Sequence, residues 1–590
     1  MKHLIFLIML TGALFAQSAD WKTDYEKSDF LETPRYDQTV EYCQRLADAS
    51  PWISYTSFGI SPQGRDLPLL IIDRNGNFTP EDVRASGNVV VYIQAGIHAG
   101  EPDGKDAGLM LAREIAVTKK LEDLIGHVTI LFNPIFNVDG HERFGAYNRI
   151  NQNGPEETGW RVTAQNYNLN RDFLKADAPE MRAFLRLYNR WLPEFFADCH
   201  VTDGADYQYA ISYKLDTHGI ADQGLIDWTE NYYIKNIKPL MAKNGYPLTP
   251  YVAFRKAHDV KSGLADWASP PRLSDGYVAA QNRTGLLIET HMFKNYKTRV
   301  TATYELLKNT LQLINKDYLN LKAITAKADS VTSQWEFRKN PFALTYQYAK
   351  DSTMINFKGY KYSVEKSDLT GGDWYRYTTD TVTYRIPHYN KMEAKVTVMP
   401  PDAYIIPVEW TEVIDRLALH GISYRRLSEP VKMMVETYRF SDVSWAKKPY
   451  EGRFPLKFDL EPVNEEIVFP AGSVVIDMNQ RTAKIIANIL EPQGRDSYLY
   501  WGFFDSIFER KEYSESYVME ERARIMLASD EDLRNEFEYK IQSDSSFAND
   551  TRAILLWFYQ KSPYWDQRIN LYPVGRIMDR REIENIQFRF

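Results

Sequence analysis

Apolar runs of strand length alternate with segments of helical periodicity over the first half of the chain. The segment NVVVYIQA at residues 88–95 is β-branched and aromatic, and residues 103–117 carry apolar side chains at helical spacing. Helices are also predicted over residues 179–191 and, as one long closing helix, over residues 301–326. Further strands are predicted in HVTILFNPIF, FFADCHVTD and TGLLIETHMF. This alternation predicts an α/β fold with helices packed on a sheet.

The pattern changes near residue 327. Residues 340–400 contain short runs rich in tyrosine and threonine between turn signals, which is an antiparallel β signature. The segment that follows, PDAYIIPVEWTEVIDRLALHGISYRRL, predicts strand, helix and strand, and the last hundred residues are charged and partly helical. We therefore expect a first module over residues 19–326 and a second, β-rich and α/β module over residues 327–590.

The N-terminus has the features of a secretory signal. A basic start at Lys2 precedes an apolar run from Leu4 to Phe15, and small residues follow. The run is too short to span a bilayer comfortably, so we expect a signal peptide over residues 1–18, with an uncleaved anchor as the alternative. No later segment predicts stable membrane insertion. These features predict a secreted or periplasmic protein.

Composition narrows the function classes further. The 590 residues are 44% hydrophobic, which is enough for several cores, and the formal net charge is −8. Acidic and basic residues are interspersed without a basic stripe, which argues against a nucleic-acid partner. Cys43 and Cys199 are the only cysteines, so the exported chain is no disulfide scaffold. Their pairing and the oligomeric state are open.

Polar residues with metal-binding chemistry stand where predicted strands end. His98 and Glu101 lie on the turn after residues 88–95, His200 follows the apolar run of another strand, and Glu289 ends LLIE. Side chains at strand carboxyl ends can converge outside a sheet. Two imidazoles and one carboxylate suit Zn²⁺ with an open position for water, and Glu289 is then the candidate general base.

Between these positions lie two arginines that suit anion recognition. An oxyanion needs a fixed donor, and a substrate carboxylate needs a planar partner. Arg161 and Arg171, the latter beside Asn170, offer both. Taken singly, each residue has a plain alternative: the arginines and Glu289 as salt-bridge partners, and Glu101 as a helix N-terminal charge. Their joint occurrence favours a site. The chain has no HExxH motif, GxSxG elbow or Walker loop.

These motifs together resemble the zinc metallocarboxypeptidases of the carboxypeptidase A type. HAGE resembles the His-x-x-Glu zinc motif of that family, and NPIFNVDGHERF resembles its Asn-Pro-x-x-Asn-Pro-Asp-Gly turn, with Val138 in place of a proline. GWR with NLNRDF, CHVTDG and LLIET resemble three further motifs in family order. The resemblance covers roughly residues 30 to 320, about half of the chain.

The resemblance implies a mixed, twisted, eight-stranded sheet between helices, with one Zn²⁺ per chain. It implies that Glu289 activates water, Arg161 stabilises the oxyanion, and Asn170 with Arg171 holds the substrate's terminal carboxylate. Zinc would be bound by His98, Glu101 and His200. The family also places a mobile tyrosine before its glutamate base. Tyr277 is the nearest candidate here, at closer spacing than is usual, and Tyr251 is its rival.

We therefore expect a secreted zinc metallocarboxypeptidase that acts on peptides with a free C-terminal carboxylate. The alternatives are a zinc amidase that acts on cell-wall or other non-protein amides, and a peptide-binding relic without catalysis. The Asn170-Arg171 pair favours a free carboxylate beside the scissile bond, and the presence of Glu289 disfavours the relic. The sequence leaves open the side-chain preference and the role of residues 327–590.

Overall fold

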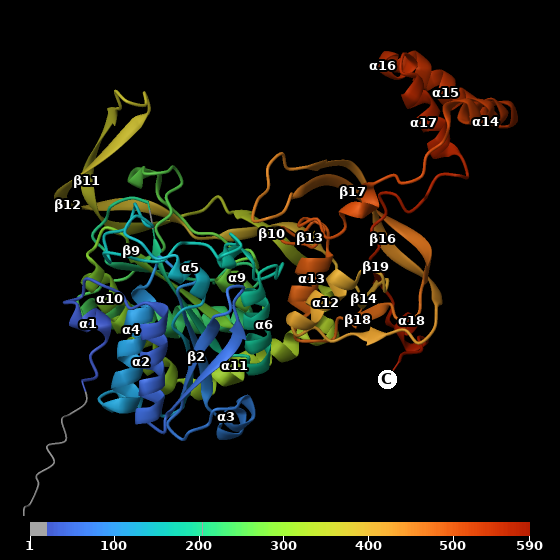
Figure 1. Ribbon diagram of the computed structural model, residues 1–590. Coiled ribbons are helices and arrows are strands. Elements are labelled where there is room, and N and C mark those ends of the chain that lie inside the picture. The colour runs from blue at the N-terminus through green and yellow to red at the C-terminus, as the bar shows by residue number, and fades with distance from the viewer. Residues whose placement is uncertain (1–19, 203, 590) are drawn as a thin grey trace, which may run out of the picture.

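The computed structural model describes residues 20–202 and 204–589, which form two bodies that lie side by side (Figure 1). An eight-stranded mixed sheet with helices on its faces builds the first body, and a six-stranded sheet builds much of the second. This confirms the expected fold class, including the β-rich C-terminal part. The predicted signal peptide, residues 1–18, lies outside the described residues.

The large sheet has the strand order β1-β2-β4-β3-β5-β9-β6-β7. Its four central strands, β4, β3, β5 and β9, are parallel to one another, so their carboxyl ends meet at one edge. Those strands are apolar on both faces because helices cover both sides. The strands span Ile53–Ile60 (β1), Asp66–Ile72 (β2), Val89–Ala95 (β3), Val128–Asn133 (β4), Phe195–Thr202 (β5), Ile211–Leu215 (β6), Thr249–Pro250 (β7) and Thr284–His291 (β9).

Each face of the large sheet has its own hydrophobic core. On one face the core includes side chains of α2, α4, α8 and α10, and on the other it includes those of α6 and α9. Helix α6 begins with Pro179, whose missing N–H costs nothing at a first helical position. The helices of this body span Asp24–Lys27 (α1), Tyr36–Ala49 (α2), Pro80–Ser86 (α3), Asp103–Ala112 (α4), Val138–Glu142 (α5), Pro179–Trp191 (α6), Gln223–Trp228 (α7), Lys235–Lys243 (α8) and Ser274–Ala280 (α9).

The single long helix predicted over residues 301–326 is wrong. The structure has two helices, α10 (Tyr296–Lys316) and α11 (Tyr318–Thr332), with a break at Asp317. The backbone of Asp317 is non-helical, and its carboxylate accepts hydrogen bonds from the Trp228 indole at 2.8 Å and from Asn320 at 3.0 Å. The apolar periodicity continues through the break, where Asn315 also bonds to His127 and Asp123, so tertiary contacts rather than a local pattern accompany it.

Residues 340–400 form antiparallel strands, as the sequence predicts. β10 (Phe342–Tyr348) pairs with β13 (Met392–Val398), and β11 (Thr353–Lys366) pairs with β12 (Asp373–Tyr389) in a hairpin that projects from the body (Figure 1). β12 also pairs in parallel with β8 (Leu264–Ala265). One small sheet thus combines strands from before and after residue 326, and the division at residues 326 and 327 stays a prediction.

The second body contains the C-terminal sheet unit, which we define as residues 403–508 together with β19, that is, β14 to β19 with α12, α13 and their connecting loops. Its core is continuous with the core that α6 and α9 form on the large sheet. A group of helices, α14 to α17, projects from it (Figure 1). The elements span Ala403–Ile406 (β14), Arg425–Arg426 (β15), Val431–Trp445 (β16), Leu456–Phe469 (β17), Val474–Asp477 (β18), Gly575–Ile577 (β19), Thr411–Leu419 (α12), Ala483–Leu490 (α13), Ser516–Ser529 (α14), Glu531–Ser543 (α15), Ser545–Ala548 (α16), Thr551–Lys561 (α17) and Arg580–Glu584 (α18).

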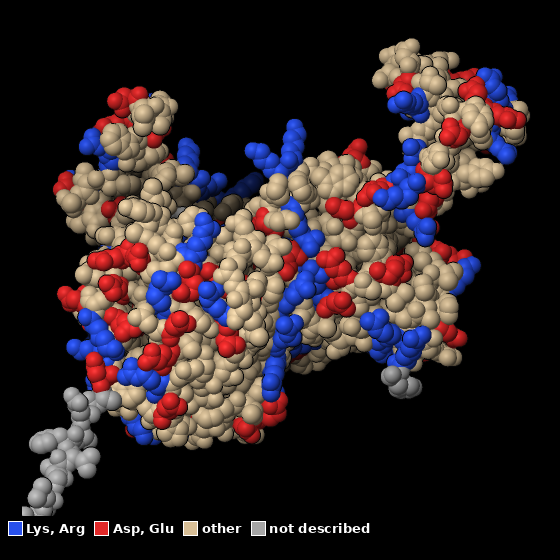
Figure 2. Space-filling view, in the orientation of Figure 1, with Lys and Arg blue, Asp and Glu red and all other residues tan. Residues whose placement is uncertain are grey.

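Three general features complete the description. Among residues 20–202 and 204–589, no helix has the length and apolar character needed to cross a bilayer. Cys43 and Cys199 are both buried and are not joined to each other. Acidic and basic side chains are interspersed over the face of the first body that Figure 2 shows.

Candidate metal centre and active site

The turn between β3 and α4 is shaped by close backbone approaches that only glycine permits. Gly96 leaves β3 with a φ of +66°, a left-handed conformation that costs glycine little. A Cβ on Gly104 would lie 2.3 Å from the Cβ of Cys199, so glycine lets α4 pack against β5. The turn is closed by a hydrogen bond from the Glu101 N–H to the His98 carbonyl at 2.9 Å. His98 and Glu101 therefore face the carboxyl end of β5, where His200 lies.

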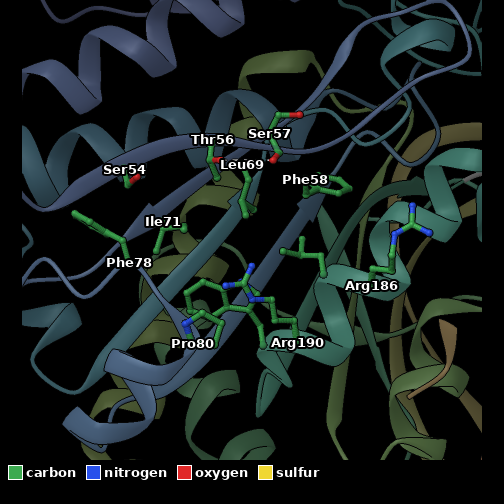
Figure 3. Close-up of a pocket in the computed structure, with 12 residues that line it drawn as sticks. Ser54, Thr56, Ser57, Phe58, Leu69, Ile71, Phe78, Pro80, Arg186 and Arg190 are labelled. Atoms are coloured by element: carbon green, nitrogen blue, oxygen red, sulfur yellow. Dashed lines mark hydrogen bonds between the residues drawn. The ribbon is translucent and has the colours of Figure 1, made fainter. Parts of the chain in front are cut away.

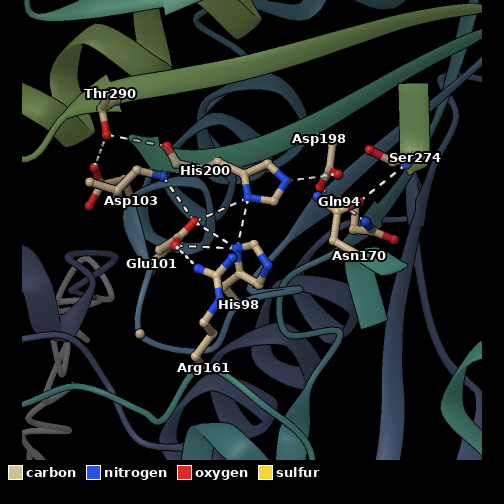
Figure 4. A network of polar contacts seen from close by, with 12 residues as sticks. Gln94, His98, Glu101, Asp103, Arg161, Asn170, Asp198, His200, Ser274 and Thr290 are labelled. Atoms are coloured by element: carbon tan, nitrogen blue, oxygen red, sulfur yellow. Dashed lines mark hydrogen bonds and ion pairs between the residues drawn. The ribbon is translucent and has the colours of Figure 1, made fainter. Parts of the chain in front are cut away.

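The structure brings His98, Glu101 and His200 together as a buried cluster (Figure 4). One candidate ligand atom from each lies within 4.8 Å of the others. Nδ1 of His200 is 3.2 Å from Nδ1 of His98 and 3.1 Å from a carboxylate oxygen of Glu101. Two imidazole nitrogens that face each other beside a carboxylate form an arrangement that suits a cation.

The second nitrogen of each histidine is held by a side-chain oxygen. Nε2 of His200 lies 2.9 Å from Asp198 Oδ2, and Nε2 of His98 lies 3.2 Å from Asn168 Oδ1. Such acceptors hold the Nε2 proton and leave Nδ1 to coordinate, which is the usual outer-shell arrangement at zinc sites. The donor set therefore fits Zn²⁺ by ligand type, ligand number and orientation.

Electrostatics keep the Glu101 carboxylate charged. Burial alone would raise its pKa, but the neighbouring His98, Arg149 and His200 side chains hold the pKa well below its usual range. Arg149 lies 2.9 Å and Arg161 3.3 Å from the same oxygen, Oε1. Burial lowers the pKa of His98 to about 4, so its imidazole is neutral and able to coordinate at neutral pH.

The cluster opens into a pocket of about 140 Å³ that also contains Arg161, Asn170, Arg171 and Glu289. Glu289 lies on β9 in direct register with His200 on β5. Asn170 and Arg171 belong to a short 3-10 helix, and the Asn170 side chain accepts a hydrogen bond from the Ser274 backbone at 3.2 Å. All but one of the residues predicted from the sequence thus line the same pocket.

Tyr277 is the exception. It is completely buried in α9, and its hydroxyl lies 3.0 Å from Nδ1 of His420 in the C-terminal sheet unit. The pocket is instead lined by Tyr251, which packs edge-on against Trp267 at a centroid distance of 5.2 Å. The expectation that Tyr277 contacts substrate is corrected, because its side chain points into the shared core.

A comparison with known protein families tests the family resemblance that the sequence motifs indicated. A family model described as zinc carboxypeptidase matches residues 39–408, which is more than half of the chain. The chain belongs to the zinc carboxypeptidase family. It is therefore a hydrolase of the metallocarboxypeptidase type, and the match extends well beyond residue 326.

Individual relatives of this zinc carboxypeptidase are distant. Carboxypeptidase 2 of Trichophyton rubrum is 23% identical over 495 residues, which cover 80% of this chain and 85% of that protein. Among solved structures, carboxypeptidase A of Helicoverpa armigera is 16% identical, with a TM-score of 0.36, and the match covers 50% of this chain and 74% of that one. A metallo-carboxypeptidase of Pseudomonas aeruginosa is also 16% identical, with a TM-score of 0.36 over 48% of this chain and 69% of that one.

Three residues of the zinc carboxypeptidase site escaped the sequence analysis. Asp198 precedes His200 by two positions, so the period of a strand puts both on one face. A carboxylate inside a buried strand is unusual, so Asp198 could have been predicted as a residue of the site from the sequence. Asn168 lies in the polar NYNLNR segment, where nothing distinguishes it from its neighbours. Arg149 reaches Glu101 from a loop, and no local pattern marks it.

Another hollow, of about 390 Å³, lies between β1, β2 and α6 (Figure 3). Its charged side chains are the exposed Arg186 and Arg190, and its lining includes no histidine, cysteine or carboxylate. It therefore lacks ligands for a metal, and the smaller pocket around His200 remains the candidate active site of this zinc carboxypeptidase.

Proposed function

We propose that the protein removes the C-terminal residue from peptides with a free carboxylate, as a zinc-dependent carboxypeptidase. The observation that carries this proposal is the shared pocket. Two histidines and a glutamate with orientated Nδ1 and carboxylate atoms lie there beside Glu289 and two arginines. A pocket with convergent polar groups is the expected form of such a site.

His98, Glu101 and His200 would hold one zinc ion. Bound there, zinc supplies Lewis acidity and a water whose pKa is lowered to about 7. Glu289 would take the proton from the attacking water and pass it to the leaving amine, which is the general base and acid role. Its register with His200 supports this assignment, since both side chains line one pocket.

Two groups of donors would handle the charges of the substrate. Arg161 is half-exposed and lies at the pocket wall, where its guanidinium can donate to the oxyanion that develops on the scissile carbonyl. Arg171 with Asn170 would bind the terminal carboxylate, because a guanidinium fork matches its geometry. Tyr251 would contact the last residue of the peptide. The sequence analysis gave Tyr277 as the first candidate for this role and Tyr251 as its rival.

Residues 1–18 would direct export, so we propose that the enzyme acts in the periplasm or outside the cell. The support for this is the basic start and short apolar run of the sequence. A peptidase that trims free C-termini is compatible with either compartment.

The test is product analysis on a peptide library with free or amidated C-termini. We expect release of single C-terminal residues from free ends only. Arg171→Gln should raise KM for free ends and remove the preference over amidated ends, while kcat changes less. Lys308→Gln, a change at a partly buried salt bridge on α10 away from the pocket residues, is the control and should match the wild type. Cleavage of both kinds of ends by the wild-type enzyme would replace this proposal with an amidase.

A further inference from the structure

The C-terminal sheet unit packs directly behind the part of the pocket that contains Asn170 and Arg171. Phe173 and Leu174 share one core with Leu417 and Trp501 of that unit. In Figure 1, α6 and α9 lie beside α12 and α13. The segment of residues 172–178, which immediately follows Arg171, therefore lies at the junction of the two bodies.

Two arginines of the C-terminal sheet unit converge on Asp177. Arg453 donates from Nε to Asp177 Oδ2 at 2.8 Å and from Nη2 to Oδ1 at 2.7 Å. Arg416 donates to Asp177 Oδ1 at 3.1 Å and to the Lys175 carbonyl at 2.8 Å. Burial alone would raise the pKa of Asp177, but the Arg453 hydrogen bonds and the charges of Lys175 and Arg416 lower it to about 2. The pair Arg453 and Asp177 is bidentate, which fixes direction as well as distance.

Hydrogen bonds within residues 172–178 connect Asp177 to Asp172, the residue after Arg171. Asp172, completely buried, accepts hydrogen bonds from the Asp177 N–H at 3.0 Å and from the Ala178 N–H at 2.8 Å. Asp172 is the residue after Arg171, and satisfied buried hydrogen-bond networks are rigid. We therefore expect a shift of Asp177 to be transmitted through this turn to the base of the Arg171 side chain.

A second set of contacts joins the C-terminal sheet unit to segments that lie next to the pocket residues. His420 of the C-terminal sheet unit donates from Nε2 to the Leu174 carbonyl at 2.9 Å and accepts the Tyr277 hydroxyl proton on Nδ1 at 3.0 Å. Burial lowers the pKa of His420 to about 4, so the ring is neutral and can play both roles. The Arg272 N–H also donates to Asp496 at 3.0 Å. Arg272 lies two residues before Ser274, whose N–H donates to the Asn170 side chain.

We propose that Arg416 and Arg453 are positioning residues that hold Asn170 and Arg171, through Asp177, at the place where the terminal carboxylate of the substrate binds. This inference rests on the proposed function. It assigns the C-terminal sheet unit a part in substrate recognition, whereas a stabilising appendage would affect only the free energy of unfolding.

The test compares Arg416→Gln, Arg453→Gln and the double variant with the wild-type enzyme. We expect each single variant to raise KM for free C-termini several-fold, and the double variant about 10-fold or more, with kcat within about 2-fold. The preference for free over amidated ends should fall by the same factor as KM rises. Zinc content should not change, because no metal ligand contacts these arginines in the described structure.

Arg338→Gln is the matched control. Arg338 is as buried as Arg416 and pairs with Asp402 at 2.8 Å, but in the described part of the chain it has no hydrogen bond or ion pair with residues 169–178. It should lower the melting temperature without changing KM. Asp177→Asn removes the charge that both arginines bind, with no change of shape, and should reproduce the result of the double variant. It replaces the arginine variants in the test if those fail to fold. Arg453→Lys, which keeps the charge, should restore part of the loss.

A second readout avoids turnover. In a Glu289→Gln background, the dissociation constant of a fluorescent peptide with a free C-terminus should rise with Arg416→Gln and Arg453→Gln, whereas that of its amidated form should not. Equal KM values in these variants and in Arg338→Gln, while Arg171→Gln still loses its preference, would overturn the positioning role alone. Loss of discrimination in the wild-type enzyme itself would overturn the proposed function and this inference together.

Discussion

His200 and Glu289 are register partners on the adjacent parallel strands β5 and β9, and both side chains line one pocket. Residues in register on neighbouring strands project from the same face of the sheet. The sheet itself thus fixes the distance between a candidate metal ligand and the proposed base. Loops contribute the remaining groups.

Glu289→Gln should abolish turnover while leaving the metal in place. The amide cannot accept the proton of the attacking water, and loss of a general base costs on the order of 10² or more in kcat. Zinc analysis and kcat on the same preparation check this. A variant that retains more than about a tenth of wild-type kcat would show that another group takes the proton.

Asp198→Asn should weaken zinc binding by roughly 10- to 100-fold, because Asp198 orientates the His200 ring through Nε2. Competition with a chelator measures the affinity. Asp73→Asn is the control, since Asp73 is equally buried but is bonded to Asn88 and Thr129 at the amino ends of β3 and β4, the edge of the sheet opposite the metal ligands. Equal zinc affinity in the two variants would show that Asp198 does not orientate His200 for zinc binding.

Tyr251→Phe should lower kcat/KM by about 10-fold with little change in stability, because its hydroxyl belongs to a pocket residue. Tyr233→Phe, which loses a buried hydrogen bond to Thr310 at 2.7 Å, should do the reverse. Steady-state kinetics and thermal unfolding separate the two. Wild-type kinetics in Tyr251→Phe would show that the Tyr251 hydroxyl takes no part in substrate binding or turnover.

Glu180 should make stability fall as pH rises. Burial raises the pKa of this carboxyl from 4.5 to about 7, so the folded protein keeps the proton that the unfolded chain releases. The free energy of unfolding then falls between about pH 4.5 and pH 7. Glu180→Gln should be more stable than wild type by about 3 kcal/mol at pH 8 and equal to it below pH 4.5. The exposed Glu41→Gln should show no such dependence, and a pH-independent gain in Glu180→Gln would refute the explanation.

The strands and the metal-site residues could be predicted because their signals are local. Residues 89–93 (VVVYI) and 286–288 (LLI) are continuous apolar runs, and site residues follow them, Glu289 directly and His98 after a short turn. The break at Asp317 could not be predicted, since the Trp228 contact that accompanies it comes from 89 positions away. Tyr277 was misjudged for the same reason: spacing along the chain gave its position, but His420 of a later segment determines where its hydroxyl points.

The central claim is that His98, Glu101 and His200 bind one zinc ion needed for hydrolysis. Elemental analysis of the purified wild-type enzyme and of His200→Ala, each with activity measured before and after chelation and zinc addition, tests it most directly. We expect about one zinc per wild-type chain, activity that chelation removes and zinc restores, and neither zinc nor restoration in His200→Ala. Full activity without bound metal, or an equal zinc content in His200→Ala, would contradict the account.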